Sequence, residues 1–84
     1  TMAIELDPKL TYVYSSRGWI YQYKKMEHDR ALVEYTAAVT LNPKSAYYRV
    51  CRGDVYSSLK QYDKALSDYA TAIGEGIVKK LFPL

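Results

Sequence analysis

The chain repeats itself at an interval of 34 to 35 residues. The segment ALVEYTAAV, which begins at Ala31, returns as ALSDYATAI from Ala65, 34 residues later. Upstream, the dipeptide RG at 17–18 returns at 52–53, which is 35 residues later. Self-similarity at this interval is typical of helical repeat proteins, in which each unit buries its apolar face against the next unit. The repeat therefore constrains the fold more than any other feature of the sequence.

The two intervals differ because the first unit holds one extra residue. Tyr21 precedes Ala31 by ten residues, whereas the equivalent Tyr56 precedes Ala65 by nine. Since a turn accepts an insertion at low cost, we expect the extra residue in the turn that follows Tyr21.

Each unit is predicted to form two helices. Apolar residues in 31–39 and again in 65–73 follow the spacing of one helical face. The preceding helix of each unit is expected over roughly residues 10–24 and 46–59. No stretch alternates as a strand does, so the sequence predicts an all-α fold.

Short polar residues stand where helices should begin. Asp29 and Asp63 are expected to cap the second helix of each unit, and Ser45 the helix that follows it. Pro43 should end the helix before it, because proline disfavours a helical conformation at the preceding residue.

Glycine within a helical pattern indicates close packing. Gly18 and Gly53 each cost about 1 kcal/mol relative to alanine, which a close approach of the neighbouring helix would offset. Small residues on that helix and tyrosine rings between the helices complete the predicted packing set. Its other members are Tyr14, Tyr21, Ala31, Tyr35, Ala38, Tyr56, Ala65, Tyr69 and Ala72.

These motifs resemble the tetratricopeptide repeat, whose signature is W-x2-L-G-x2-Y, then A-x3-F, then P, at a period of 34 residues. The first unit has YxxRGxxY at 14–21, AxxxY at 31–35 and then Pro43; the second has RxxRGxxY at 49–56 and AxxxY at 65–69. The resemblance implies a right-handed superhelix of antiparallel helix pairs that binds peptides or partner proteins in a concave groove. It also implies that the chain has no catalytic centre.

The chain departs from this signature at several positions. Arg17 and Arg52 stand where leucine is usual, and we expect their apolar stems to cover the neighbouring helix. Arg49 takes the place of an aromatic residue. Ile77 takes the place of the closing proline, so the last helix either runs on or turns differently.

The repeat domain is expected over residues 1–76. Residues 1–8 match the end of a preceding repeat, and full repeats follow at 9–43 and 44–76. The chain therefore resembles a fragment of a longer array. Residues 77–84 form an apolar tail that caps the last pair, docks into a neighbouring molecule or leads to a further element of the parent chain.

The resemblance places the partner-binding surface on the first helix of each pair. The face turned away from the packing residues carries aromatic and small polar side chains: Tyr12, Ser15, Trp19, Gln22, Tyr23, Tyr47, Val50, Asp54 and Ser57. Trp19 is expected to contribute most to the binding energy, because its side chain buries a large area and has few rotatable bonds whose freedom is lost on binding. Its alternative role is to cover the helix of the next unit. Lys9, Lys44 and Arg49 form a rim that either steers an acidic peptide or is simply solvated.

Some relatives of the repeat hold the acidic tail of heat-shock chaperones with a clamp of lysine, arginine and asparagine on this face. The match is poor here, because the clamp positions hold Ser15, Trp19, Val50 and Asp54. Asp54 would repel a carboxylate. The partner is therefore expected to be another protein or peptide, of unknown identity.

Other classes of function receive little support. A single cysteine, Cys51, and a single histidine, His28, predict no disulfide framework, metal site or cofactor, and favour an intracellular, cytoplasmic setting. The net charge of +3 is too mild to indicate nucleic-acid binding, and no membrane segment is expected. The alternative that stays open is an assembly role, in which exposed repeat ends or the tail produce a homo-oligomer.

Overall fold

The computed structural model describes residues 8–81, with side chains for 9–74. Helix α2 covers Pro8–Trp19 and continues into a π-helical segment, η1, over Ile20–Lys24; α3 covers His28–Leu41, α4 Ala46–Ser58 and α5 Tyr62–Leu81. Every element in this part of the chain is helical, so the all-α prediction is confirmed. The predicted end of a preceding repeat, up to residue 7, lies outside the described residues.

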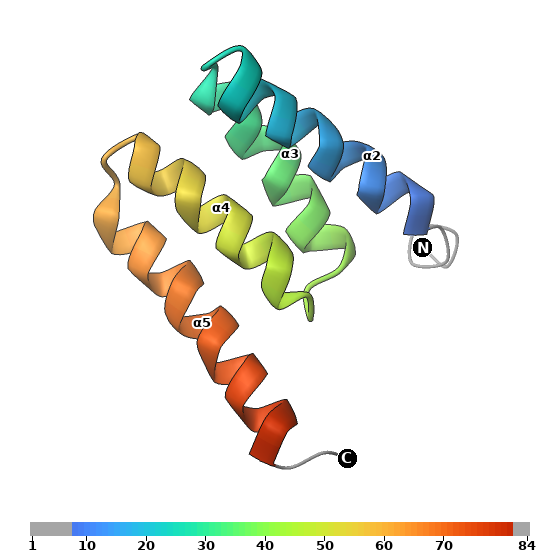
Figure 1. Ribbon diagram of the computed structural model, residues 1–84, viewed down its shortest axis with the longest axis vertical. Coiled ribbons are helices and arrows are strands. Elements are labelled where there is room, and N and C mark those ends of the chain that lie inside the picture. The colour runs from blue at the N-terminus through green and yellow to red at the C-terminus, as the bar shows by residue number, and fades with distance from the viewer. Residues whose placement is uncertain (1–7, 82–84) are drawn as a thin grey trace.

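The helices form two antiparallel pairs (Figure 1). The first helix, α2 with η1, packs along α3, and α4 packs along α5. The two pairs join because α3 also lies against α4. The molecule measures 40 × 32 × 19 Å, a flattened shape that follows from laying one pair beside the next. None of the helices in this part of the chain is long and apolar enough to cross a bilayer.

The last helix runs on beyond the repeat. Helix α5 continues to Leu81, past the predicted repeat end at residue 76. With isoleucine rather than proline at position 77, the backbone N–H that helical continuation requires is present. The predicted capping by residues 77–84 depends on side chains that lie outside the described part of the chain.

A close approach of the two helices occurs in both pairs at glycine. A Cβ added to Gly18 would lie 3.0 Å from the ring of Tyr35, and one added to Gly53 would lie 2.7 Å from the ring of Tyr69. Separations of this kind are shorter than normal carbon–carbon contact. Each tyrosine ring therefore occupies the space that a side chain on the opposite helix would need.

The core lies at the junction of the two pairs. Ala31 and Tyr35 of α3 pack with Val55 of α4, and Val55 is fully buried. Leu32 and Cys51 flank this cluster. The remaining buried apolar residues are Ala38, Val39, Ala65 and Ala72. The alanines follow the inner faces of α3 and α5, where their small side chains leave room for the facing helix.

The extra residue of the first unit lies within the helix, not in the turn as we expected. In η1 the N–H of Lys25 donates to the carbonyl of Ile20 at 3.0 Å, which is the i to i+5 bond of a π-helix. The next residue, Met26, has a φ of 57°, and the equivalent Lys60 has a φ of 63°. From this left-handed residue onward the two units are again 34 residues apart. A widened helical turn absorbs the insertion and leaves the turn itself unchanged.

The prediction that aspartates cap the second helices is wrong. Helix α3 begins at His28 with Glu27 at its N-cap position, and no side chain caps it. Asp29 and Asp63 lie one residue inside their helices, in the first turn, where a carboxylate interacts favourably with the helix dipole. The prediction for Ser45 is confirmed, since its hydroxyl accepts the N–H of Tyr48 at 3.4 Å.

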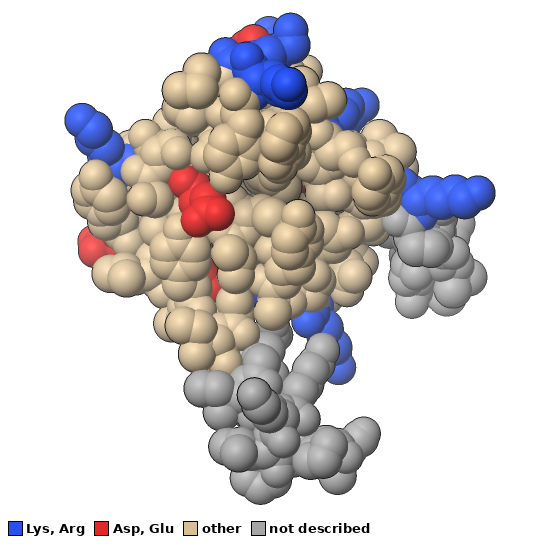
Figure 2. Space-filling view, in the orientation of Figure 1, with Lys and Arg blue, Asp and Glu red and all other residues tan. Residues whose placement is uncertain are grey.

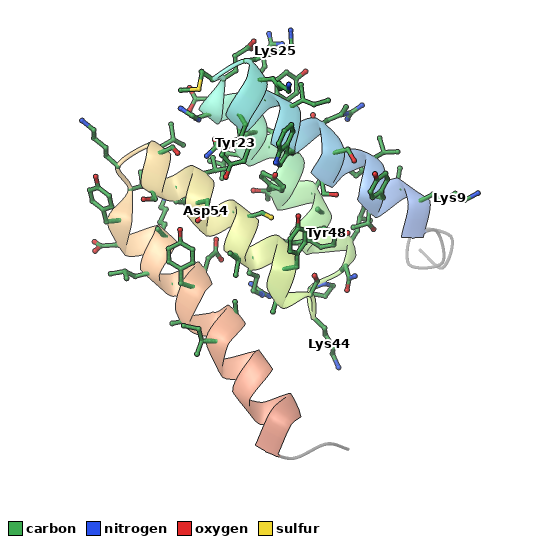
Figure 3. The ribbon with its side chains drawn as sticks, in the orientation of Figure 1. Lys9, Tyr23, Lys25, Lys44, Tyr48 and Asp54 are labelled. Carbon is green, nitrogen blue, oxygen red and sulfur yellow. The ribbon has the colours of Figure 1, made fainter. Side chains whose placement is uncertain are left out.

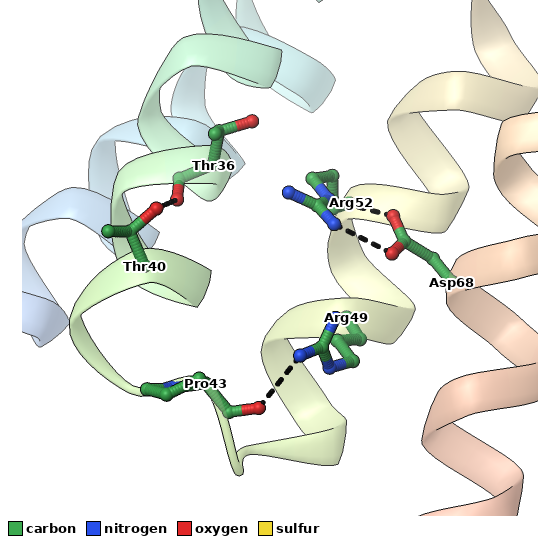
Figure 4. A network of polar contacts seen from close by, with 6 residues as sticks. All are labelled: Thr36, Thr40, Pro43, Arg49, Arg52 and Asp68. Carbon is green, nitrogen blue, oxygen red and sulfur yellow. Dashed lines mark hydrogen bonds and ion pairs between the residues drawn. The ribbon is translucent and has the colours of Figure 1, made fainter.

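Arg17 and Arg52, which stand where the repeat signature has leucine, each form an ion pair with the second helix of their pair. Nε and Nη2 of Arg52 donate to the two carboxylate oxygens of Asp68 at 2.7 and 2.8 Å (Figure 4). In the first pair, Arg17 donates to a single oxygen of Glu34 at 3.1 and 3.0 Å. The expectation that these arginines act through their apolar stems therefore missed their main contacts, because their acidic partners lie on the opposite helix.

Candidate functional site

A groove of about 490 Å³ opens where α2 faces α4. Its lining combines aromatic rings with serine hydroxyls and includes no charged residue: Tyr12, Ser15, Ser16, Trp19, Ile20, Tyr47 and Tyr48. The groove thus brings together Tyr12, Ser15, Trp19 and Tyr47, which the sequence had placed on the partner-binding face. Residues 35 apart in the sequence, Tyr12 and Tyr47, contribute rings from successive units.

Three of the four aromatic side chains that line the groove are open to solvent, and Tyr48 is half-buried. Tyr12 is 69% exposed, Tyr47 is 66% exposed and Trp19 is 47% exposed. The Trp19 ring lies against the ring of Tyr23, one helical turn further along, with centroids 5.4 Å apart and planes tilted by 49°. This contact limits the orientations open to the indole while leaving much of its surface exposed.

Three lining residues were missed by sequence reasoning. Tyr48 lies beside Tyr47, with its ring edge-on at 5.5 Å between centroids. Ser16 of α2 and Ile20 of η1 correspond to Cys51 and Val55 of α4, which lie in or against the core. The repeat therefore predicted that Ser16 and Ile20 pack against another helix, whereas Ser16 is half-buried and Ile20 is 43% exposed.

The remaining predicted residues extend the surface beyond the groove. Tyr23 is 51% exposed and Val50 is 39% exposed, while Ser57 and Asp54 are half-buried. Figure 3 places Tyr23 and Asp54 on the face that also shows Tyr48. Burial, with the nearby Asp54 carboxylate, raises the pKa of the Tyr23 hydroxyl.

The carboxylate of Asp54 already has a partner. It accepts a hydrogen bond from the hydroxyl of Tyr69 on α5. This bond, together with burial, raises the pKa of Tyr69 from its ordinary value of 10.0 to about 12. Asp54 therefore contributes to holding α4 against α5 as well as adding negative charge to the surface.

The prediction that Gln22 contacts a partner is wrong. Its side chain is 3% exposed. Its Nε2 donates to the hydroxyl of Ser58 at 2.9 Å, and its Oε1 lies 2.5 Å from Nδ1 of His28, which must donate because an amide oxygen only accepts. Gln22 thus ties the end of the first helix to α3 and α4. Its hydrogen-bonding groups are used within the protein.

The charged rim lies away from the groove. Lys9 and Lys44 are exposed and point outward, Lys9 at the right of the view and Lys44 at its lower edge (Figure 3). Arg49 is half-buried, and its Nη2 donates to the carbonyl of Pro43 at 2.9 Å. Figure 2 shows lysine and arginine mainly at the edges of this face, one acidic group left of its centre and uncharged residues over most of the rest. The groove itself, whose lining carries no charge, is therefore suited to uncharged side chains.

Cys51 has the surroundings of a packing residue. It contacts the core cluster, and burial raises the pKa of its thiol. A raised pKa keeps the thiol protonated at neutral pH, whereas a nucleophilic cysteine needs a thiolate. The Nδ1 of His28 contacts Gln22, and none of the described interactions joins His28 to Cys51.

Comparison with known proteins gives one informative similarity. No family model matches the chain. Over 51 residues, 61% of its length, the chain is 37% identical to the Hsp70-Hsp90 organising protein of Plasmodium falciparum (isolate 3D7). The matched segment spans 9% of that much longer protein.

Proposed function

We propose that the chain is a non-enzymatic interaction module of the tetratricopeptide type, and that its groove binds an extended segment of a partner protein. The observation that carries this proposal is the exposure of Tyr12, Trp19 and Tyr47 around one concave, uncharged lining. The similarity to a protein named for organising Hsp70 and Hsp90 supports an adaptor role within the cell.

Exposed aromatic rings in a groove favour binding for a physical reason. Tyrosine and tryptophan bury large areas at low cost in side-chain entropy, and they dominate binding energy at interfaces. Tyr12 and Trp19 are two helical turns apart, about 10 Å along α2. Tyr47 lies across from them on α4, so the rings can flank a single extended segment.

The groove chemistry indicates an uncharged segment. Because no lysine or arginine lines the groove, nothing there neutralises an acidic tail. Apolar or aromatic side chains of the ligand would contact the rings, and its backbone could hydrogen-bond to Ser15 or Ser16. Lys9 and Lys44, at the edges, would affect the rate of association more than the stability of the complex.

The repeat arrangement is part of the same proposal. We assign repeats to residues 9–43 and 44–76, with residues 1–8 as the end of a preceding repeat. Stacked in this way, successive pairs would build a right-handed superhelix with the groove on its concave side.

The proposal is tested by selecting ligands from an unbiased library of peptides displayed on phage, using the wild-type chain as bait. The dissociation constant of the strongest peptide is then measured for Trp19→Ala and Tyr47→Ala. Each change should weaken binding at least about tenfold. Tyr62→Ala, which removes a ring that is 57% exposed on α5, is the matched control and should bind normally.

Two outcomes would contradict the proposal. The first is peptide binding that Trp19→Ala and Tyr47→Ala leave unchanged. The second is selection of acidic peptides whose binding depends on Lys9 and Lys44, which would place the ligand on the rim.

A further inference from the structure

The carboxylate of Asp54 carries a negative charge that no basic residue of the described chain neutralises. Its Oδ1 accepts a hydrogen bond from the hydroxyl of Tyr69, which is uncharged. Among residues 9–74, no group donates to Oδ2 and no ion pair includes Asp54. No carboxylate oxygen in this part of the chain is both buried and without a partner, so Oδ2 of the half-buried Asp54 is accessible from solvent.

Two tyrosine rings lie beside this carboxylate. Tyr69 donates to it from α5. Burial and the Asp54 carboxylate raise the pKa of the Tyr23 hydroxyl, so Tyr23 also lies close by, and Figure 3 shows Tyr23 and Asp54 together to the left of Tyr48. The Tyr23 side chain is exposed and that of Tyr69 is half-buried. We call Asp54 with these two rings the Asp54 site.

The rings of the Asp54 site have no cation of their own. Elsewhere in the molecule, the guanidinium of Arg17 lies 5.4 Å from the centre of the Tyr14 ring. Among residues 9–74, no lysine or arginine lies over the ring of Tyr23 or Tyr69. Because the face of an aromatic ring attracts a cation, rings beside an unneutralised carboxylate are suited to a positively charged group from outside.

The charges around the Asp54 site favour the same kind of group. Figure 2, drawn in the orientation of Figure 3, shows an acidic group left of the centre of the face, with lysine and arginine mainly at the edges. A neutral ligand that covered Asp54 would remove an unpaired charge from water, which is costly. A cation on the ligand offsets this cost.

The Asp54 site continues the groove. The ring of Trp19, which lines the groove, lies 5.4 Å from the ring of Tyr23. On α4, Asp54 follows Tyr47 by seven residues, which is about 10 Å along the helix. Since an extended chain covers about 10 Å in three residues, a segment in the groove would present a side chain to Asp54 about three residues further along.

We propose that the segment bound in the groove carries a lysine or arginine about three residues from the side chain that contacts Tyr47, and that this cation binds at the Asp54 site. The inference rests on the proposed groove binding and adds a charge preference to it. An N–H group of the cation donates to Oδ2 of Asp54, while its charge lies against the rings of Tyr23 and Tyr69. Like-charge repulsion excludes an acidic residue from the same position of the ligand.

The test uses the strongest peptide from the phage selection and a copy whose basic residue is replaced by norleucine, which keeps an apolar stem without the charge. Dissociation constants of both peptides are measured for wild type and Asp54→Asn. The amide oxygen of asparagine can still accept the Tyr69 hydroxyl, so folding should be retained, and circular dichroism with thermal unfolding verifies this. Asp29→Asn is the matched control, because it removes the same charge from an exposed position on α3.

We expect the selected peptides to share a lysine or arginine two to four residues from an aromatic or apolar residue. Asp54→Asn should weaken binding of the basic peptide about tenfold and should bind the norleucine peptide as wild type does. Asp29→Asn should bind both peptides with the wild-type constants.

Two results would overturn this inference and leave groove binding intact. The first is a set of peptides that depend on Trp19 and Tyr47 but share no basic residue at that position. The second is an effect of Asp54→Asn that is the same for the basic and the norleucine peptide. Conversely, binding that Asp54→Asn weakens and that Trp19→Ala and Tyr47→Ala leave unchanged would contradict the groove proposal and support the Asp54 site.

Discussion

Arg52 on α4 holds Asp68 on α5 through two parallel hydrogen bonds of 2.7 and 2.8 Å, with both side chains largely buried. The equivalent pair, Arg17 with Glu34, has the same helix positions but an arginine side chain that is 52% exposed. The same arginine–carboxylate ion pair thus occurs in both helix pairs, but its side chains are more exposed in the first pair than in the second. Burial decides how much the loss of one partner costs, because an unpaired charge is tolerated in water and is unfavourable in the interior.

Removing the acidic partner should therefore affect the two pairs unequally. We expect Asp68→Ala to lower the free energy of unfolding by about 3 kcal/mol, because it leaves the Arg52 guanidinium buried without its partner. Glu34→Ala should cost about 0.5 kcal/mol. Urea denaturation measures both values. Arg52→Leu combined with Asp68→Leu should recover most of the loss, and equal costs at the two sites would contradict the role given to burial.

Glycine-to-alanine changes should affect stability in opposite directions, depending on whether another helix lies close to the glycine. Alanine favours a helix over glycine by about 1 kcal/mol, so Gly74→Ala, with nothing within 4 Å of the added Cβ, should be stabilising. Gly53→Ala should instead destabilise by about 1–3 kcal/mol, because the new Cβ would lie 2.7 Å from the Tyr69 ring. Thermal unfolding of the two variants gives the comparison.

Gly18→Ala provides a second test of the same idea. Its Cβ would lie 3.0 Å from the ring of Tyr35, which is 3% exposed and has little room to move. We expect destabilisation here too. If all three glycine variants were stabilised, the helices would not be as close as the structure has them.

Stability should fall at high pH through Tyr69. Because the pKa of Tyr69 is raised to about 12 in the folded state from 10.0, its contribution is fully present below pH 10. The contribution is lost as the pH rises towards 12, since the unfolded state releases its proton first. Unfolding free energies of wild type and Tyr69→Phe, measured across this range, should converge as the pH rises.

A change at Asp54 tests the cause of that shift. Asp54→Asn removes the carboxylate that accepts the Tyr69 hydroxyl. The alkaline loss of stability through Tyr69 should then be smaller than in wild type and should end at lower pH, because it begins near pH 10 in both proteins and stops at the folded pKa, which moves back towards 10.0. An unchanged profile would show that the hydrogen bond does not raise the pKa.

Deleting one residue from the first unit should be tolerated. Removing the exposed Lys25 restores the spacing of the second unit, so η1 can become an ordinary α-helical turn while Gly18 and Tyr21 keep their positions. We expect a change in stability within about 1 kcal/mol. Removing Lys60, in the unit without the insertion, should be strongly destabilising because it shifts α5 against α4. Chemical denaturation compares the two deletions, and similar losses would contradict the assignment of the extra residue to η1.

Much of the fold follows from local sequence. The matched apolar positions around Ala31 and Ala65, the glycines at 18 and 53 and the cap at Ser45 all act within one helix or one pair. Their spacing therefore predicted the helices and the tight contacts between them. The predicted caps at Asp29 and Asp63 lie two residues past the N-cap positions, because a left-handed backbone residue ends each preceding turn and sets where the next helix begins.

The repeat spacing predicted that the chain forms paired helices, and the resemblance predicted one surface for Tyr12, Trp19 and Tyr47. Which of the equivalent positions are covered depends on how the helices pack against one another. Ile20 and Val55 match in the repeat, as do Ile73 and Val39, yet one member of each pair is buried and the other exposed. The reason is physical: periodicity fixes which face of a helix is apolar, whereas burial depends on whether another helix lies against that face. Gln22 shows the same limit, since its amide is buried by partners 6 and 36 residues away.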